Sequence, residues 1–249
     1  MVETHAMNEF PIQSQTSETD KDFIFRMKNI FGALQRPYDY VEIGSFMGGS
    51  LTPFLFDSYC LSVLSIDDRG HAIKDERGIN VDYTPITSQA MRDNLTKHGV
   101  PTTKLTTYDY SIETLASVER RYDLAFIDGE HTDLACFRDF LYVLPLLKSD
   151  AIVMFHDSSL VYKALQMIRV YATRNFPSFR LVKKKDSEMS ALFLGTFAAI
   201  KPEDLFGEME DFDTFCTISE DLRALWLFKH RAESASEISL KPIRTLRAY

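Results

Sequence analysis

The glycine-rich segment EIGSFMGGS, residues 42–50, is the strongest chemical signal in the sequence. Glycine permits a tight turn and lets backbone N–H groups approach a ligand closely, because no Cβ intervenes. The segment lacks the lysine and Ser/Thr of a phosphate-binding loop, which disfavours a nucleoside triphosphate. Such a turn could therefore bind a ligand through its backbone, although a purely structural turn fits the glycine pattern equally well when taken alone.

Carboxylates stand where a nucleoside cofactor needs them. Asp67 and Asp68 follow the next apolar run, about 20 residues after the glycines, where an acid can accept both ribose hydroxyls. Asp67 is the better candidate because it directly follows the last apolar residue. Asp109, after the predicted strand 104–108, could bracket an adenine together with an aromatic ring, although a surface loop has the same composition.

Glu42 is a charge in a position that otherwise reads as buried strand. A buried carboxylate is costly unless it is paired. Glu42 therefore either fixes the loop backbone or binds the amino group of a cationic ligand, unless it lies in solvent at the strand end.

Two further polar clusters, FIDGEH and FHDS, follow consecutive apolar runs. The four side chains of interest are Asp128, His131, His156 and Asp157. The carboxyl ends of parallel strands meet at one edge of a sheet, so we expect these groups to converge. Asp128, His156 and Asp157 could ligate a divalent metal. Alternatively, His131 and His156, beside Asp128, could act as general bases near neutral pH. Each histidine alone would more often be a cap or a structural residue, but the pairing of both with aspartates favours a site.

The elements that must position these clusters alternate between short apolar runs and helical patterns, which is typical of βαβ units and a mostly parallel sheet. The predicted strands are 40–43, 61–66, 104–108, 122–127 and 151–155. The predicted helices are a segment from residue 20 that ends before Pro37, then 50–59, 88–98, 112–118, 134–146 and 162–173. The runs 179–184 and 191–197 are too close for a crossover helix, so they predict an antiparallel hairpin.

Length and composition describe an ordinary globular chain of 249 residues with 45% hydrophobic and 26% charged content. We expect a flexible N-terminal arm over residues 1–19, one α/β domain over 20–200 and a C-terminal helical extension over 201–249. The net charge of −8 argues against nucleic-acid binding and favours a small-molecule or protein substrate. Exposed apolar residues within 222–228 are compatible with a homodimer.

The cysteines Cys60, Cys136 and Cys216 are odd in number and widely spaced, which excludes a disulfide framework or a CxxC zinc motif. This usage predicts a reducing, cytoplasmic setting. No apolar run of about 18 residues and no signal-peptide pattern occurs, so we expect a protein that neither spans a membrane nor is secreted.

The combination of motifs resembles the class I S-adenosylmethionine-dependent methyltransferases, and in detail the methyltransferase domain 24 family. The resemblance covers residues 38–197 and is most specific in YDLAFIDGEH, in Asp139 and in the strand ending VMFHD. It implies a Rossmann-like, doubly wound sheet of seven strands in the order 3-2-1-4-5-7-6, with an antiparallel last strand. It also implies a cofactor site with contacts from Glu42, Gly44, Ser45, Gly48, Asp67, Asp68, Asp109 and Asp128.

The resemblance implies methyl transfer from S-adenosylmethionine to a hydroxyl of a small metabolite, such as a sugar or natural product. Relatives that methylate sugar or catechol hydroxyls hold a divalent ion, such as Mg²⁺, at positions that map onto Asp128, His156 and Asp157. His156 stands where those relatives usually have a carboxylate.

Two other functions remain open at this stage. A cofactor-binding regulatory or scaffold protein without turnover would need the same fold. An NAD-dependent oxidoreductase would use the same glycine turn and strand-end acid, although the final hairpin and the two polar strand ends argue against it.

Overall fold

The computed structural model describes residues 10–12, 16–69, 72–82, 86–115 and 119–239. Most of the predicted flexible arm, residues 1–19, lies outside these ranges. Within it, Ile12 is buried and Phe10 packs against the core. The predicted domain boundaries at residues 19 and 200 stay predictions.

One central sheet of eight strands organises the molecule. The strands are β1 (Tyr38–Ile43), β2 (Cys60–Ile66), β5 (Leu105–Tyr108), β6 (Tyr122–Ile127), β7 (Leu147–Phe155), β8 (Phe179–Lys184), β9 (Ser190–Leu194) and β10 (Met209–Glu210). They lie in the order β5-β2-β1-β6-β7-β9-β8-β10. The first five strands of this order, from β5 to β7, pair in parallel, whereas β9 runs antiparallel to both β7 and β8.

The predicted sheet order is confirmed, with one more strand at the edge. β10 has two residues and pairs with the end of β8. So short a strand has no periodicity that a sequence pattern could register. The separate two-stranded sheet of β3 (Ala72–Lys74) and β4 (Asn80–Asp82) was missed for the same reason.

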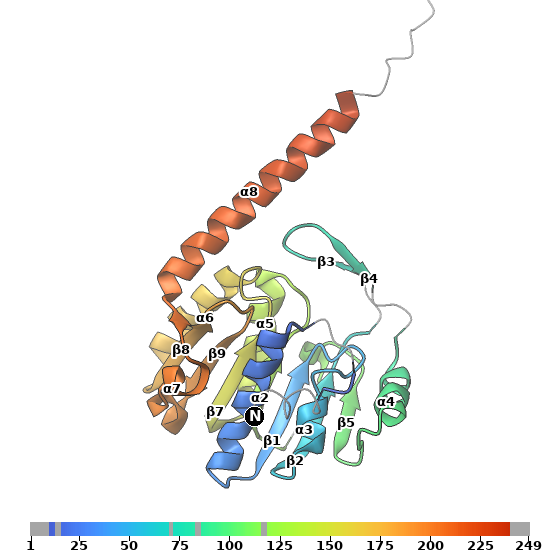
Figure 1. The fold of residues 1–249 in the computed structure, drawn as a ribbon, viewed down its shortest axis with the longest axis vertical. Coiled ribbons are helices and arrows are strands. Elements are labelled where there is room, and N and C mark those ends of the chain that lie inside the picture. The colour runs from blue at the N-terminus through green and yellow to red at the C-terminus, as the bar shows by residue number, and fades with distance from the viewer. Residues whose placement is uncertain (1–9, 13–15, 70–71, 83–85, 116–118, 240–249) are drawn as a thin grey trace, which may run out of the picture.

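Helices cover both faces of the sheet (Figure 1). They are α2 (Glu18–Ala33), α3 (Thr52–Phe56), α4 (Ser88–Lys97), α5 (Asp133–Val143), α6 (Tyr162–Asn175), α7 (Pro202–Phe206) and α8 (Phe212–Ser239). Side chains of β1 alternate between two cores, because successive residues of a strand point to opposite faces. Tyr40 packs with α2, α3 and α4, whereas Val41 and Ile43 pack with α5 and α6.

Three of the helices begin at side-chain caps that the sequence carries. The hydroxyls of Ser17, Thr87 and Thr132 accept hydrogen bonds from backbone N–H groups in the first turns of α2, α4 and α5. Such caps satisfy donors that the helix itself leaves unpaired. The starts of α2, α4 and α5 therefore lie within two residues of the predicted ones.

Several predicted boundaries were wrong. The helix expected over 50–59 is the single turn and a half of α3, because the chain must leave it early to enter β2. The strand expected to reach residue 197 ends at Leu194. Gly195 adopts a φ of +61° and begins a 3-10 helix over Gly195–Ala199. The helix expected over 112–118 is a 3-10 turn over Ile112–Thr114, and residues 116–118 lie outside the described ranges.

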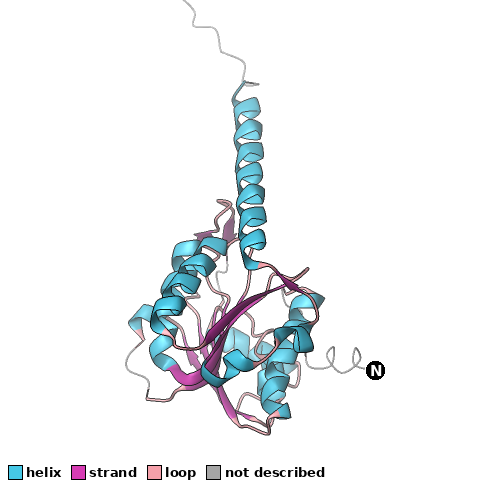
Figure 2. Cartoon of the chain, turned by 90° about the vertical axis from the view of Figure 1, so that its left-hand side faces the viewer, coloured by secondary structure: helices cyan, strands magenta, loops and turns pink. Residues whose placement is uncertain are grey.

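The C-terminal helix α8 extends well beyond the body of the domain (Figures 1 and 2). Its first turns bury Phe215 and Cys216 against the core on the α6 side of the sheet. Among the described helices, none is both long and apolar enough to cross a bilayer.

Candidate functional site

Backbone hydrogen bonds join the segments that follow five neighbouring strands. The N–H of Gly44 donates to Ile66 O (2.9 Å), and the N–H of Asp128 donates to Ile43 O (2.9 Å). The same ladder continues from Asp67 to Tyr108 O (3.0 Å) and from His156 to Ile127 O (3.2 Å). The polar residues after β1, β2, β5, β6 and β7 consequently lie along one rim, as expected for parallel strands.

The first turn of this rim requires glycine. Gly44 has a φ of +89°, and a Cβ placed on it would lie 1.9 Å from the backbone oxygen of Asp128. Gly48 has a φ of +83°, and its Cβ would lie 3.1 Å from Met91. Only glycine adopts such angles without strain, so the close approach of the β1 and β6 loops depends on Gly44.

Glu42 holds this turn from below. Its side chain is fully buried and accepts hydrogen bonds from Tyr40 Oη (2.5 Å) and Ser50 Oγ (2.7 Å). Burial raises the pKa of Glu42 to about 8, because the charged form loses its hydration. Both carboxylate oxygens are engaged by the protein, which favours the loop-fixing role among the alternatives above.

Asp67 ties the end of β2 to the glycine turn. Its Oδ2 accepts the N–H of Phe46 at 2.7 Å, and burial raises its pKa. Ser45, the other polar residue of the turn, has its hydroxyl 2.8 Å from Ser65 Oγ. Asp68 is exposed.

The sequence analysis missed Arg69, whose side chain is 5% exposed. Its guanidinium lies 3.6 Å from Asp67 and 3.2 Å from Asp109, and it donates to Phe46 O at 2.6 Å. Arg69 thus joins the two carboxylates predicted to hold the ribose and the adenine side of a nucleoside. No spacing rule indicates that an arginine in a polar loop turns inward.

Asp128, His131 and Asp157 form a compact cluster on the β6 and β7 side of the rim. One ligand atom from each lies within 4.8 Å of the others. His131 Nε2 is 3.1 Å from Asp157 Oδ2 and 4.0 Å from Asp128 Oδ1. Two carboxylates and an imidazole offer oxygen and nitrogen donors suited to a divalent cation.

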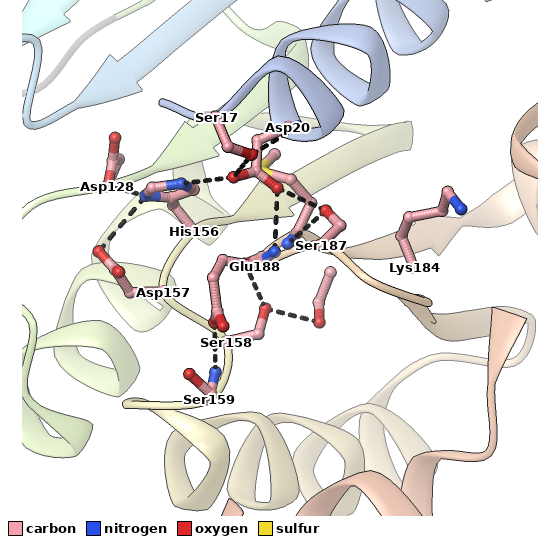
Figure 3. Close-up of polar contacts among 12 residues, drawn as sticks. Ser17, Asp20, Asp128, His156, Asp157, Ser158, Ser159, Lys184, Ser187 and Glu188 are labelled. Carbon is pink, nitrogen blue, oxygen red and sulfur yellow. Dashed lines mark hydrogen bonds and ion pairs between the residues drawn. The ribbon is translucent and has the colours of Figure 1, made fainter. Parts of the chain in front are cut away.

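His156 lies behind this cluster and faces carboxylates on both sides (Figure 3). Its Nδ1 is 3.0 Å from Asp128 Oδ1 and 3.3 Å from Asp157 Oδ2, while Nε2 lies 3.5 Å from Asp20 Oδ2. Burial opposes a charge on His156, but Asp128 and the other two carboxylates outweigh it and raise the pKa of the imidazole well above its usual value. A protonated imidazole has no lone pair for a metal. The geometry therefore favours His131 over His156 as the third ligand, and the predicted ligand role of His156 stays a prediction.

Asp20, in the first turn of α2, is a second residue that the sequence analysis missed. It is 3% exposed and accepts hydrogen bonds from Ser187 Oγ (2.5 Å) and the N–H of Glu188 (2.9 Å), in the turn between β8 and β9. The pair Ser17 and Asp20 has the spacing of a capping box. That signal identifies a helix start, but it does not reveal that Asp20 reaches the site.

The turn of the β3–β4 hairpin and helix α8 also approach the rim. The N–H of Glu76 donates to His131 O at 3.1 Å, and Glu76 Oε1 accepts the N–H of Asp133 at 2.7 Å. Arg223 of α8 lies 3.3 Å from Glu76 Oε2 and 2.8 Å from Asp133 Oδ2. Neither the β3–β4 turn nor helix α8 belongs to the central sheet. These contacts hold both of them next to His131.

Residues 41–158, just under half of the chain, match the family model described as "Methyltransferase domain". This segment is therefore similar to the methyltransferase domains of that family. The match begins in β1, includes the glycine turn and the FIDGEH segment, and ends directly after Asp157. The predictions of a class I fold and of an S-adenosylmethionine-dependent methyltransferase are confirmed.

Solved structures share the fold of the methyltransferase domain at low sequence identity. The O-methyltransferase NovP is 11% identical with a TM-score of 0.54, and the match covers 76% of this chain and 87% of that one. The methyltransferase domain of bacterial CtHen1 is 14% identical with a TM-score of 0.51, covering 72% of this chain and all of that one. A comparison with curated protein sequences found no match.

Proposed function

We propose that this chain transfers a methyl group from S-adenosylmethionine to a hydroxyl oxygen of a small molecule. The observation that carries the proposal is the cluster of Asp128, His131 and Asp157 beside the glycine turn, within a domain of the methyltransferase family. O-methylation needs two parts on one rim: a cofactor site, and side chains that accept a proton or ligate a metal.

The residues along β1, β2 and β5 fit the nucleoside of the cofactor. Asp67 uses Oδ2 for Phe46 and Arg69, while Oδ1 makes no hydrogen bond with the residues the structure describes and is available to ribose hydroxyls. Ser111 lies two residues after Asp109. Its hydroxyl is buried and has no hydrogen-bond partner among the residues that the structure describes. A buried polar atom of this kind normally has a partner, and an adenine nitrogen would supply one.

The predicted contacts of the cofactor are therefore kept as proposals with different weights. Asp67, Asp109, Gly44, Ser45 and Gly48 line the turn and its neighbouring strand ends. Glu42 supports the turn from the buried side, and Asp68 is exposed.

When bound, the cofactor supplies an electrophilic methyl group. The acceptor oxygen would bond to that carbon as the carbon–sulfur bond breaks, S-adenosylhomocysteine would leave, and the oxygen would lose its proton. Asp157 accepts the Nε2–H of His131 at 3.1 Å, which orients the imidazole and leaves its Nδ1 to accept this proton. Alternatively, Asp128, His131 and Asp157 would together hold a divalent cation, which would lower the proton affinity of the hydroxyl. Nε2 of His131 carries a proton in the first mechanism and must be free of one in the second, so the two mechanisms are distinct.

His156 acts on this cluster from behind in either mechanism. As an imidazolium between Asp20 and Asp128, it holds the Asp128 carboxylate in place and lowers its negative charge density. Asp20 in turn is fixed by the β8–β9 turn through Ser187. We assign positioning roles to both residues.

Calorimetric titration of the full chain with S-adenosylmethionine tests the cofactor site. Loss of two ribose hydrogen bonds should raise the dissociation constant of Asp67→Ala by about 10- to 100-fold. Asp93→Ala, at an exposed carboxylate on α4, is the matched control and should change it less than about threefold. Binding of NAD in place of S-adenosylmethionine, or equal effects of the two substitutions, would contradict the proposal.

Transfer of a labelled methyl group to a panel of catechols, phenols and sugars tests the reaction. Asp157→Ala should lower turnover at least tenfold while the affinity for S-adenosylmethionine is kept. Activity that is lost in EDTA and restored by Mg²⁺ supports the cation mechanism, whereas activity unchanged by EDTA supports His131 as the base. Cofactor binding without transfer to any acceptor in the panel supports the scaffold alternative.

A cytoplasmic location and the absence of nucleic-acid and membrane partners belong to this proposal as well. All three cysteines are buried free thiols, which supports a reducing compartment.

A further inference from the structure

Helix α8 carries an apolar stripe that the other described residues leave uncovered. Ile218 is 46% exposed, Leu222 57%, Leu225 65% and Phe228 74%. Residues spaced three and four apart lie on one side of a helix, so these four form a continuous stripe about 15 Å long. Soluble chains seldom expose a contiguous apolar surface of this kind unless it binds a partner.

The opposite side of α8 is the one that attaches to the domain. Phe215, Cys216 and Ser219 are buried, and Arg223 reaches Asp133 at 2.8 Å. These four residues fix the direction in which the helix leaves the body. The stripe consequently points away from the chain's own α6.

A groove of about 610 Å³ runs along the outer side of α6, with α5 on its other side. Its apolar wall consists of Phe137, Met167, Val170 and Tyr171, and two cations, Lys163 and Arg174, lie at its ends. Both cations are exposed and neither forms an ion pair with a described residue. The groove lies on the helical face of the domain, away from the rim that holds Asp128 and Gly44.

The stripe and the groove match in length and in charge. Lys163 and Arg174 are eleven residues apart on α6, or about 16 Å, which is close to the length of the stripe. Asp221 lies within the stripe, is exposed and forms no ion pair with a described residue. An apolar helix face that carries an exposed acid thus meets an apolar groove bordered by bases.

We propose that α8 of one copy docks in the α5–α6 groove of a second copy of this chain, and that the exchange is reciprocal. Each copy presents both surfaces, so a two-fold axis closes the assembly without leaving a free stripe or groove. Arg223 anchors each helix to its own domain. The dimer therefore couples α8, and through Arg223 the β3–β4 turn beside His131, to a second subunit.

Sedimentation velocity of the full chain over about 1–200 µM tests the assembly. The molecular mass of the native protein from sedimentation should be twice the 28.6 kDa of one chain. Leu222→Asp and Met167→Asp should each raise the dissociation constant at least tenfold, because each places a charge in one half of both contacts. Circular dichroism should show both variants folded, since both side chains are about half exposed. Leu34→Asp, with an exposure of 56% at the end of α2, is the matched control and should remain dimeric.

Mixing the two variants separates this arrangement from other ones. A heterodimer of Leu222→Asp with Met167→Asp contains one intact helix–groove contact, so an equimolar mixture should form dimers at concentrations where each variant alone is monomeric. A monomeric native chain overturns the proposal. A dimer that survives Met167→Asp but not Leu222→Asp indicates that two α8 helices pair with each other, and this result also overturns the proposal. A mixture of the two variants that stays monomeric overturns it as well.

Discussion

Replacing Glu42 by glutamine should stabilise the protein near neutral pH. The carboxyl is fully buried beneath the glycine turn, and its pKa rises from an ordinary value of 4.5 to about 8. A glutamine side chain has nearly the same shape as a protonated, uncharged glutamate side chain. Its oxygen can accept from Ser50 Oγ, and its amide can donate to Tyr40 Oη, so both contacts of the native side chain are kept.

The sign and size of the effect follow from proton linkage. Because the folded state binds the Glu42 proton more tightly than the unfolded state, its contribution is fully present below pH 4.5 and is lost as the pH rises towards 8. Each pH unit in this window costs about 1.4 kcal/mol, which gives about 3 kcal/mol by pH 7. Glu42→Gln removes this titration and should recover about that amount at pH 7 but almost nothing at pH 4.5.

Urea denaturation followed by circular dichroism at pH 4.5, 7 and 8.5 measures the difference. Glu203→Gln, on the exposed first turn of α7, is the control and should change the free energy of unfolding by less than about 0.5 kcal/mol at every pH. A Glu42→Gln effect that is independent of pH, or a loss of stability at pH 8.5, would refute the linkage argument. A large loss of S-adenosylmethionine affinity in Glu42→Gln would instead show that the carboxylate binds the cofactor's amino group.

Two further substitutions test the geometry of the rim. Gly44→Ala should lower the free energy of unfolding by about 2–5 kcal/mol in thermal or urea denaturation, because its Cβ would meet the Asp128 backbone. Gly99→Ala is the control and should lower it by only about 1–2 kcal/mol, because Gly99 has a φ of +71° but open space around it. Equal costs would show that the β1 and β6 loops separate easily. Arg223→Ala should increase amide hydrogen exchange in α8 around residue 223, because the ion pairs with Glu76 and Asp133 are lost. The exchange of β6 and β7 should stay unchanged. Unchanged protection of α8 would show that apolar contacts alone hold this helix.

The sequence by itself determined the layout of the sheet and the place of the site. Alternating apolar runs and helical patterns follow from period-2 and period-3.6 burial, which are local properties of the chain. The order of the strands and their shared rim then required only the rules of parallel sheets and the family resemblance. Gly44, Asp67 and Asp128 could be selected in this way because each directly follows a predicted strand, and Asp157 because it comes one residue after such a strand.

Only the tertiary structure decided which polar groups meet at atomic distance. Asp20 and Ser187 are 167 residues apart, and their contact depends on how α2 packs beside the β8–β9 turn. Arg69 turns inward between two carboxylates, and that direction depends on neighbours from other strands. Spacing along a chain specifies which face a residue occupies, but ion pairing and burial depend on distances across the fold. The contact of His131 with Asp157, and the place of His156 between Asp20 and Asp128, therefore appeared only when the strands were assembled.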